Sequence, residues 1–136
     1  MTYLLDTNAV VALLKDKPAI VRTRYRQASE ADAYVAVSSI VLFELWYGVA
    51  KSSRPKENAE RLRVFTSGRL DVLTFDDEDG QTAGQARAGL EAAGTPIGPY
   101  DILITGQAVR HGLTLVTANV SEFSRVPNLE WENWAV

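Results

Sequence analysis

Short apolar segments of strand length alternate with longer segments of helical character along the whole chain. The strand-like segments are Tyr3–Leu5, Tyr34–Val37, Val72–Phe75, Leu113–Thr117 and a short last one at Leu129–Trp131. Strands that alternate with helices pair in parallel, through right-handed crossovers that place helices on both faces of the sheet. The pattern therefore predicts an α/β fold with three α/β/α layers and a central parallel sheet of about four to five strands.

Start and stop signals delimit the helices between these strands. Thr7 and Asn8 are expected to cap the first helix and Ser38-Ser39 the third. The expected helices are Ala9–Leu14, a second opened by Pro18, a third ending near Gly48, Asn58–Phe65, Glu78–Ala93 and one from Asp101 to His111. The acidic run Asp76–Asp79 suits a helix N-terminus, where negative charge is favourable. No repeat or linker interrupts the pattern, so residues 1–136 are expected to form a single domain.

Composition removes several classes of protein. The chain has no cysteine and one histidine, His111, so disulfides, thiolate zinc sites and His-rich metal sites are excluded. We interpret His111 as the C-terminal residue of a helix, where it interacts with the helix dipole. No signal peptide and no apolar run of membrane-spanning length is present, so we expect a soluble cytoplasmic protein without a membrane partner.

Three carboxylates stand inside apolar segments. Asp6 ends Tyr3–Leu5, Glu44 interrupts an apolar helix, and Asp101 precedes Ile102-Leu103-Ile104. An ionised carboxylate that loses its hydration needs a cation, and no Lys or Arg lies within three residues of any of the three. A hard divalent ion such as Mg²⁺ or Mn²⁺ is the simplest common partner for oxygen ligands. These carboxylates indicate a metal-dependent enzyme that acts on phosphates.

The charge distribution leaves room for a nucleic-acid partner. The formal net charge is -3, but 11 of the 14 basic residues lie between Lys15 and Arg69. Such clustering gives one face a positive potential on an acidic protein. The alternative reading is that Arg22, Arg24 and Arg26 are only the solvated side of a helix.

Four ordered motifs carry a resemblance to a known family. Leu5–Asn8, Ser38–Leu45, Pro99–Ile104 and Leu115–Phe123 resemble the motifs of PIN domains, and nearly the whole chain is similar to the VapC-type ribonuclease toxins of toxin–antitoxin pairs. The tail Phe123–Leu129 with Trp131–Trp134 is similar to the branch that cuts initiator transfer RNA.

The resemblance implies a role for each matching residue. Asp6 and Asp101 match the principal metal ligands, and Glu44 matches the second acid, as a catalytic residue and a further candidate ligand. Asn119 falls at the fourth acidic position, where its amide supplies an oxygen without charge. Glu122 is an alternative fourth acid, although we interpret it as a flanking residue because Phe123 fixes its direction. Hydrogen-bond partners around these ligands are expected at Thr7, Asn8 and Thr117.

The resemblance also implies the reaction and the partners. Water, activated by Mg²⁺ or Mn²⁺, would hydrolyse RNA to 5′-phosphate and 3′-hydroxyl ends and so inhibit translation. The family implies a small cognate antitoxin (VapB-like) and a toxin homodimer within a hetero-oligomer, with the apolar helix Val41–Tyr47 as a candidate interface.

Two alternatives remain open. The first is a non-catalytic PIN-type RNA-binding or scaffold domain, although such domains lose the acids that this chain keeps. The second is another Mg²⁺-dependent phosphoryl-transfer enzyme. It is disfavoured because Asn8 stands where an aspartyl-phosphate phosphatase needs a second aspartate, and because no lysine follows Lys56.

Overall fold

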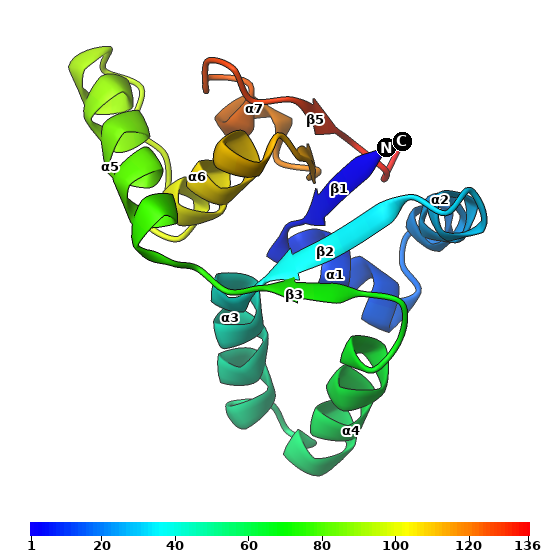
Figure 1. Ribbon diagram of the computed structural model, residues 1–136. Coiled ribbons are helices and arrows are strands. Elements are labelled where there is room, and N and C mark those ends of the chain that lie inside the picture. Colours follow the sequence, from blue (N-terminus) through cyan, green and yellow to red (C-terminus); the bar gives the residue numbers. More distant parts are fainter.

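A five-stranded sheet in which every neighbouring pair is parallel forms the centre of the protein. The computed structural model describes residues 1–136 and orders the strands β3-β2-β1-β4-β5 (Figure 1). Their bounds are β1 Thr2–Leu5, β2 Tyr34–Ser38, β3 Asp71–Leu73, β4 Thr114–Val116 and β5 Trp131–Glu132. The predicted α/β architecture with a parallel sheet is confirmed.

Helices cover both faces of this sheet. They are α1 Thr7–Lys15, α2 Ala19–Glu30, α3 Ser39–Ala50, α4 Pro55–Thr66, α5 Asp77–Ala92, α6 Asp101–His111 and α7 Val120–Phe123. The chain moves from β1 to β3 in one direction along the sheet and then returns past β1 to β4 and β5. Right-handed crossovers therefore put α1 to α4 on one face and α5 to α7 on the other (Figure 1). None of the helices is both long and apolar enough to cross a membrane.

The central strands are buried on both faces. Leu4, Leu5, Val37 and Leu115 have no exposed surface, as expected for a parallel sheet covered by helices on each side. Burying each such side chain stabilises the fold by roughly 1.5–3 kcal/mol before the entropy of ordering is subtracted. This core fixes the ends of β1, β2 and β4 relative to one another.

Several local predictions were displaced by one to three residues. The third strand is Asp71–Leu73 and not Val72–Phe75, and the last is Trp131–Glu132. Helix α4 begins at Pro55, before the predicted Asn58, because proline suits the first helical position. The short helix α7 was not predicted at all. These shifts change no strand order.

The predicted cap of the first helix is wrong, and that of the third is confirmed for Ser38 but not for Ser39. Asp6, and not Thr7 or Asn8, caps α1 by accepting the backbone N–H of Ala9. Ser38 alone caps α3, through the N–H of Ile40. The hydroxyl of Ser39 instead accepts the backbone N–H of Phe75, which joins α3 to the segment after β3.

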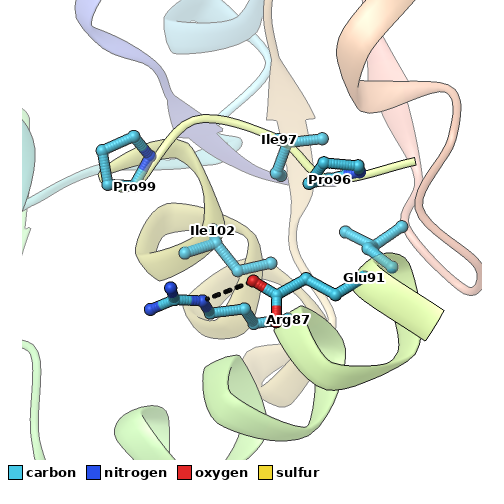
Figure 2. A pocket seen from close by; sticks show the side chains of 7 residues that line it. Arg87, Glu91, Pro96, Ile97, Pro99 and Ile102 are labelled. Carbon is cyan, nitrogen blue, oxygen red and sulfur yellow. Dashed lines mark hydrogen bonds and ion pairs between the residues drawn. The ribbon is translucent and has the colours of Figure 1, made fainter. Parts of the chain in front are cut away.

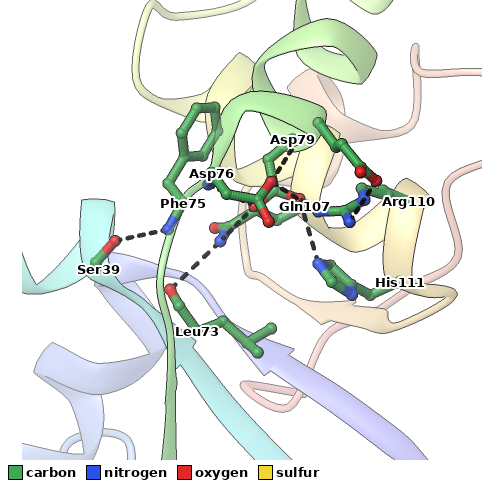
Figure 3. A network of polar contacts seen from close by, with 9 residues as sticks. Ser39, Leu73, Phe75, Asp76, Asp79, Gln107, Arg110 and His111 are labelled. Carbon is green, nitrogen blue, oxygen red and sulfur yellow. Dashed lines mark hydrogen bonds and ion pairs between the residues drawn. The ribbon is translucent and has the colours of Figure 1, made fainter.

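A polar network joins the start of α5 to the end of α6 (Figure 3). Asp79 is completely buried, and its carboxylate lies 2.9 Å from Nη1 of Arg110 and 3.2 Å from Nε2 of His111. Asp76 and Asp79 also form the capping box of α5, so the acidic run does begin a helix as predicted. His111 ends α6 as predicted, and its contact with Asp79 adds to its position at the helix terminus. The network fixes α6, the helix that begins with Asp101.

Helices α5 and α6 approach each other closely at one glycine. A Cβ atom placed on Gly106 would lie 2.6 Å from Cβ of Ala83 and 2.8 Å from its backbone Cα and N. Only a residue without a side chain allows this approach.

The predicted basic cluster is only partly available to a ligand. Arg22 pairs with Asp16 at 2.7 Å and also donates to the carbonyl of Leu13, and Arg24 donates to the carbonyl of Val136. These contacts explain the presence of Arg22 and Arg24 without any role in binding a ligand. Two exposed cations, Lys51 and Arg63, lie over the aromatic rings of Tyr47 and Trp46 on the apolar helix α3.

Candidate active site

The strand order reverses at the boundary between β1 and β4. Ligands in open parallel sheets bind beyond the carboxyl ends of the strands at such a reversal. Asp6 directly follows β1, and Thr117 directly follows β4. The two residues share this edge with Ser38, which is the last residue of β2 and leads into α3. The sheet therefore brings the first predicted carboxylate to the position where a ligand is expected.

Asp6 is held in a fixed orientation at the start of α1. Its Oδ1 accepts the backbone N–H of Ala9 at 2.8 Å, and only 4% of the residue is exposed. Burial raises the pKa of Asp6, and the nearby charge of Glu44 adds to this, although hydrogen bonds from Thr117 and from the N–H of Ala9 lower it. Asp6 is thus a buried carboxylate that forms no ion pair with a cationic side chain.

Glu44 enters the site from the second turn of α3. The hydroxyl of Thr7 donates to Oε1 of Glu44 at 2.8 Å, so the residue beside Asp6 orients the second carboxylate. Glu44 is half-buried. The structure brings Asp6, Thr7 and Glu44 together, as the sequence predicted.

Asp101 is carried into the site by the loop 94–100, which contains Pro96 and Pro99. This loop lies over α5 and α6, above a cavity of about 150 Å³ next to Ile102 and the ion pair of Arg87 with Glu91 (Figure 2). Proline fixes φ, so the loop has few alternative conformations. The stiff loop and the network at the far end of α6 together hold Asp101 in place.

Glu122 lies next to Asp101, which favours its alternative reading as a fourth acid over that of a flanking residue. Its Oε1 accepts the backbone N–H of Gly98 at 2.7 Å, and its Oε2 accepts the side-chain amide of Asn119 at 3.1 Å. A Cβ atom on Gly98 would lie 3.1 Å from Oδ2 of Asp101 and 3.4 Å from Oε1 of Glu122, so the two carboxylates converge over this glycine. The unpredicted helix α7 is what turns Glu122 inward.

Asn119 and Asn8 differ from their predicted roles. The amide of Asn119 is used to orient Glu122, so Glu122 is the residue that supplies a fourth carboxylate. Thr117 accepts the N–H of Asn119 and donates to Asp6, which links β4 to the first carboxylate. The exposed Asn8 makes no hydrogen bond to a carboxylate of the site.

Asp101 holds a proton more readily than its neighbour Glu122. Burial raises the pKa of Asp101 to about 7, with further contributions from Glu122, Glu44 and Asp6. The N–H of Gly98, ahead of smaller contributions from Asp101 and Asn119, holds the pKa of Glu122 below its usual value. The negative charge therefore rests on Glu122 and the proton on Asp101.

The donor set fits a hard divalent ion. All donors are oxygens, and none of the ion pairs in the protein involves Asp6, Glu44, Asp101 or Glu122. No three acidic side chains already surround one point as a cluster that could hold an ion. The neighbouring acids also raise the pKa values of Asp6 and Asp101, as expected for carboxylates that lie near one another without a cation.

The raised pKa of Asp101 predicts the pH dependence of stability without metal. Between about pH 4, where an unfolded aspartate ionises, and about pH 7, the native state binds more protons than the unfolded state. The free energy of unfolding should therefore fall as the pH rises through this window. The raised pKa of Asp6 changes stability in the same direction, whereas the lowered pKa of Glu122 affects stability mainly below this pH window. Urea unfolding in EDTA measures the slope, which should be smaller in Asp101→Asn; an equal slope in both proteins would contradict the prediction.

Comparison with known proteins places this site in a family. Residues 3–129 match the PIN domain model. The chain is 40% identical over 134 residues, 98% of each protein, to the tRNA(fMet)-specific endonuclease VapC of Salmonella typhimurium. It is also 40% identical over 134 residues, again 98% of each, to ribonuclease VapC2 of Rickettsia felis.

Solved structures agree with this relationship. A chain of the VapBC2 complex of Rickettsia felis, bound to a DNA fragment from its promoter, matches with a TM-score of 0.92 and 39% identity, over 98% of this chain and 99% of that one. The DNA-bound VapBC complex of Salmonella typhimurium matches with a TM-score of 0.90 and 40% identity, over 98% of each chain. The present chain therefore belongs to the PIN-domain family and, within it, to the VapC ribonucleases of toxin–antitoxin systems.

Proposed function

We propose that this protein is the toxin of a type II toxin–antitoxin pair and acts as a divalent-metal-dependent endoribonuclease. The observation that carries the proposal is the group of four carboxylates, Asp6, Glu44, Asp101 and Glu122, which lies beside the reversal in strand order and forms no ion pair with a cationic side chain. Its relatives named as ribonucleases support the class of reaction.

Asp6 and Asp101 are the residues that would hold Mg²⁺ or Mn²⁺, with Glu44 and Glu122 completing the acidic lining. When bound, such an ion lowers the pKa of water and neutralises charge that develops on the phosphate oxygens. Asp6 is rigid because it caps α1, and Thr7 holds Glu44 facing the site. The proposed role of Glu44 is to orient the attacking water and to accept its proton.

The reaction is hydrolysis at phosphorus. The water oxygen forms the new bond to phosphorus, the bond to the ribose 3′ oxygen breaks, and that oxygen takes a proton. The products carry a 5′-phosphate and a 3′-hydroxyl. No ribose 2′-hydroxyl participates as nucleophile, so 2′,3′-cyclic ends should not form.

Initiator transfer RNA is the proposed substrate. Two relatives at 40% identity are named tRNA(fMet)-specific endonucleases. Loss of initiator transfer RNA would stop translation and so inhibit growth. A cognate VapB-like antitoxin is the proposed protein partner, because the structural relatives are VapBC complexes.

A cleavage assay with purified protein tests this function. We expect initiator transfer RNA to be cut with Mg²⁺ or Mn²⁺, EDTA to abolish cutting, and excess ion to restore it. Sequencing of the fragments should show 5′-phosphate ends. Elongator methionine transfer RNA is the matched control for the substrate, and Asp6→Asn protein purified in parallel controls for contaminating nuclease.

Each failure has a distinct meaning. Cutting that persists in EDTA would contradict the metal-dependent mechanism. RNA binding without cutting under any ion would favour the non-catalytic alternative. Equal cutting of both transfer RNAs would leave an endoribonuclease but overturn the proposed substrate.

A further inference from the structure

Two exposed aromatic rings stand beside the candidate catalytic carboxylates. Phe43 precedes Glu44 on α3, and Tyr100 precedes Asp101 at the start of α6. Their ring centroids lie 5.6 Å apart at an interplanar angle of 58°, although Phe43 is 55% exposed and Tyr100 44%. Burial in the protein core therefore does not explain why both positions are aromatic.

The aromatic surface continues along α3 with cations above the rings. Phe43, Trp46 and Tyr47 are spaced so that they share one side of the helix. The guanidinium of Arg63 lies 5.5 Å from the ring centroid of Trp46, and the ammonium of Lys51 lies 4.6 Å from that of Tyr47. Trp46 is 37% and Tyr47 60% exposed. Contiguous exposed aromatic surface of this kind marks a binding site.

We propose that the Phe43–Tyr100 pair is a stacking platform for an unpaired base next to the scissile phosphate, and that Lys51 and Arg63 contact the RNA backbone leading to it. Proteins that recognise RNA in loops stack splayed bases on aromatic rings and neutralise phosphates with Lys and Arg. The pair would select a cleavage position where a base can leave the helical stack. This inference rests on the proposed ribonuclease function.

Charge favours RNA over a second copy of the chain on this face. The sequence predicted helix Val41–Tyr47 as a self-association surface, and its aromatic residues are indeed uncovered. In a twofold interface, however, the patch faces itself, so Lys51 and Arg63 would be brought towards their own copies. Neither cation has an ion-pair partner in the protein. The phosphates of a polyanion such as RNA would neutralise both cations, and the aromatic rings would stack with its bases.

Substitutions that remove the rings but keep apolar bulk test the platform. We expect Phe43→Leu and Tyr100→Leu to weaken binding of substrate RNA by roughly five- to a hundredfold each, measured in EDTA to prevent cleavage. Phe43→Trp should preserve binding because it keeps a stacking ring. Trp131→Leu, an exposed aromatic on the far edge strand β5, is the matched control and should bind like wild type.

Modified versions of the same RNA test which base stacks on the platform. Substrate with 2-aminopurine beside the cut should lose fluorescence on binding to wild type and lose less with Phe43→Leu. Removing that base should weaken binding to wild type but not weaken Phe43→Leu further. Lys51→Glu should reduce the salt dependence of binding, whereas Arg87→Glu on the opposite helical layer should not.

The outcomes separate the platform from the ribonuclease. If wild type cuts RNA and the two Leu variants bind it equally well, the platform is wrong and the proposed function stands. If wild type cuts no RNA, the proposed function itself fails. If the Leu variants convert a dimer into a monomer in sedimentation while RNA affinity per monomer is unchanged, the face is a self-interface and the platform is overturned.

Discussion

An Asp101→Asn variant is expected to lose RNA cleavage by about a thousandfold or more while it keeps the wild-type fold. The substitution preserves shape and removes the carboxylate that the ion needs, and a bound ion supplies several kcal/mol of transition-state stabilisation. Burial and the neighbouring acids already disfavour the charge on Asp101. Thermal stability without metal should therefore be unchanged or higher.

Initial rates on initiator transfer RNA, with Mn²⁺ titrated, measure this effect. Asp6→Asn should behave in the same way, because Asp6 is the buried member of the group. Asn119→Ala should lose much less, since Asn119 acts only by orienting Glu122. Near-normal cleavage by Asp101→Asn would contradict the assignment of this residue as a metal ligand.

Gly106→Ala is expected to destabilise the protein by about 2 kcal/mol. The added methyl group would overlap the backbone of Ala83, which cannot rotate away as a side chain could. Overpacking typically costs about 1–3 kcal/mol, and this clash with backbone should lie near the upper end of that range. Replacing a helical glycine by alanine gains roughly 1 kcal/mol, which offsets part of this cost. Urea unfolding measures the loss, and Asp101 should move with α6, so cleavage should fall as well.

Gly84→Ala on the partner helix is the matched control. A Cβ atom there meets nothing within 4 Å, so alanine should stabilise α5 by about 0.5–1 kcal/mol. Equal behaviour of the two variants would show that the approach of α5 to α6 at Gly106 does not limit stability.

The local sequence pattern was enough to predict an α/β fold with a parallel sheet and to single out the first three carboxylates. Asp6, Glu44 and Asp101 interrupt apolar segments, so the cost of a charge beside hydrocarbon was visible in the sequence. Thr7 stands next to Asp6, and its contact with Glu44 follows once β1 and α3 share a sheet edge. Parallel pairing alone brings the ends of these elements together.

Features that depend on direction or on distant partners were not predictable in this way. The orientation of Glu122 is set by α7 and by the N–H of Gly98, 24 residues away in the sequence. Asp79 was read only as a helix N-terminal charge, because its partner Arg110 lies 31 residues further on. An Asp-x-x-Asp capping box was the one available signal that Asp79 points back into the protein.

The central place of β1 has a consequence for synthesis of the protein. This strand pairs with β2, formed by residues 34–38, and with β4, formed by residues 114–116. While the chain is still growing on the ribosome, one edge of β1 has no strand beside it, and Asp101 and Glu122 have not joined Asp6. A nascent chain, or a fragment cut short before β4, therefore lacks the assembled carboxylates. If the proposed site is correct, we expect the translation machinery to meet this nuclease in active form only when nearly all of the chain has left the ribosome.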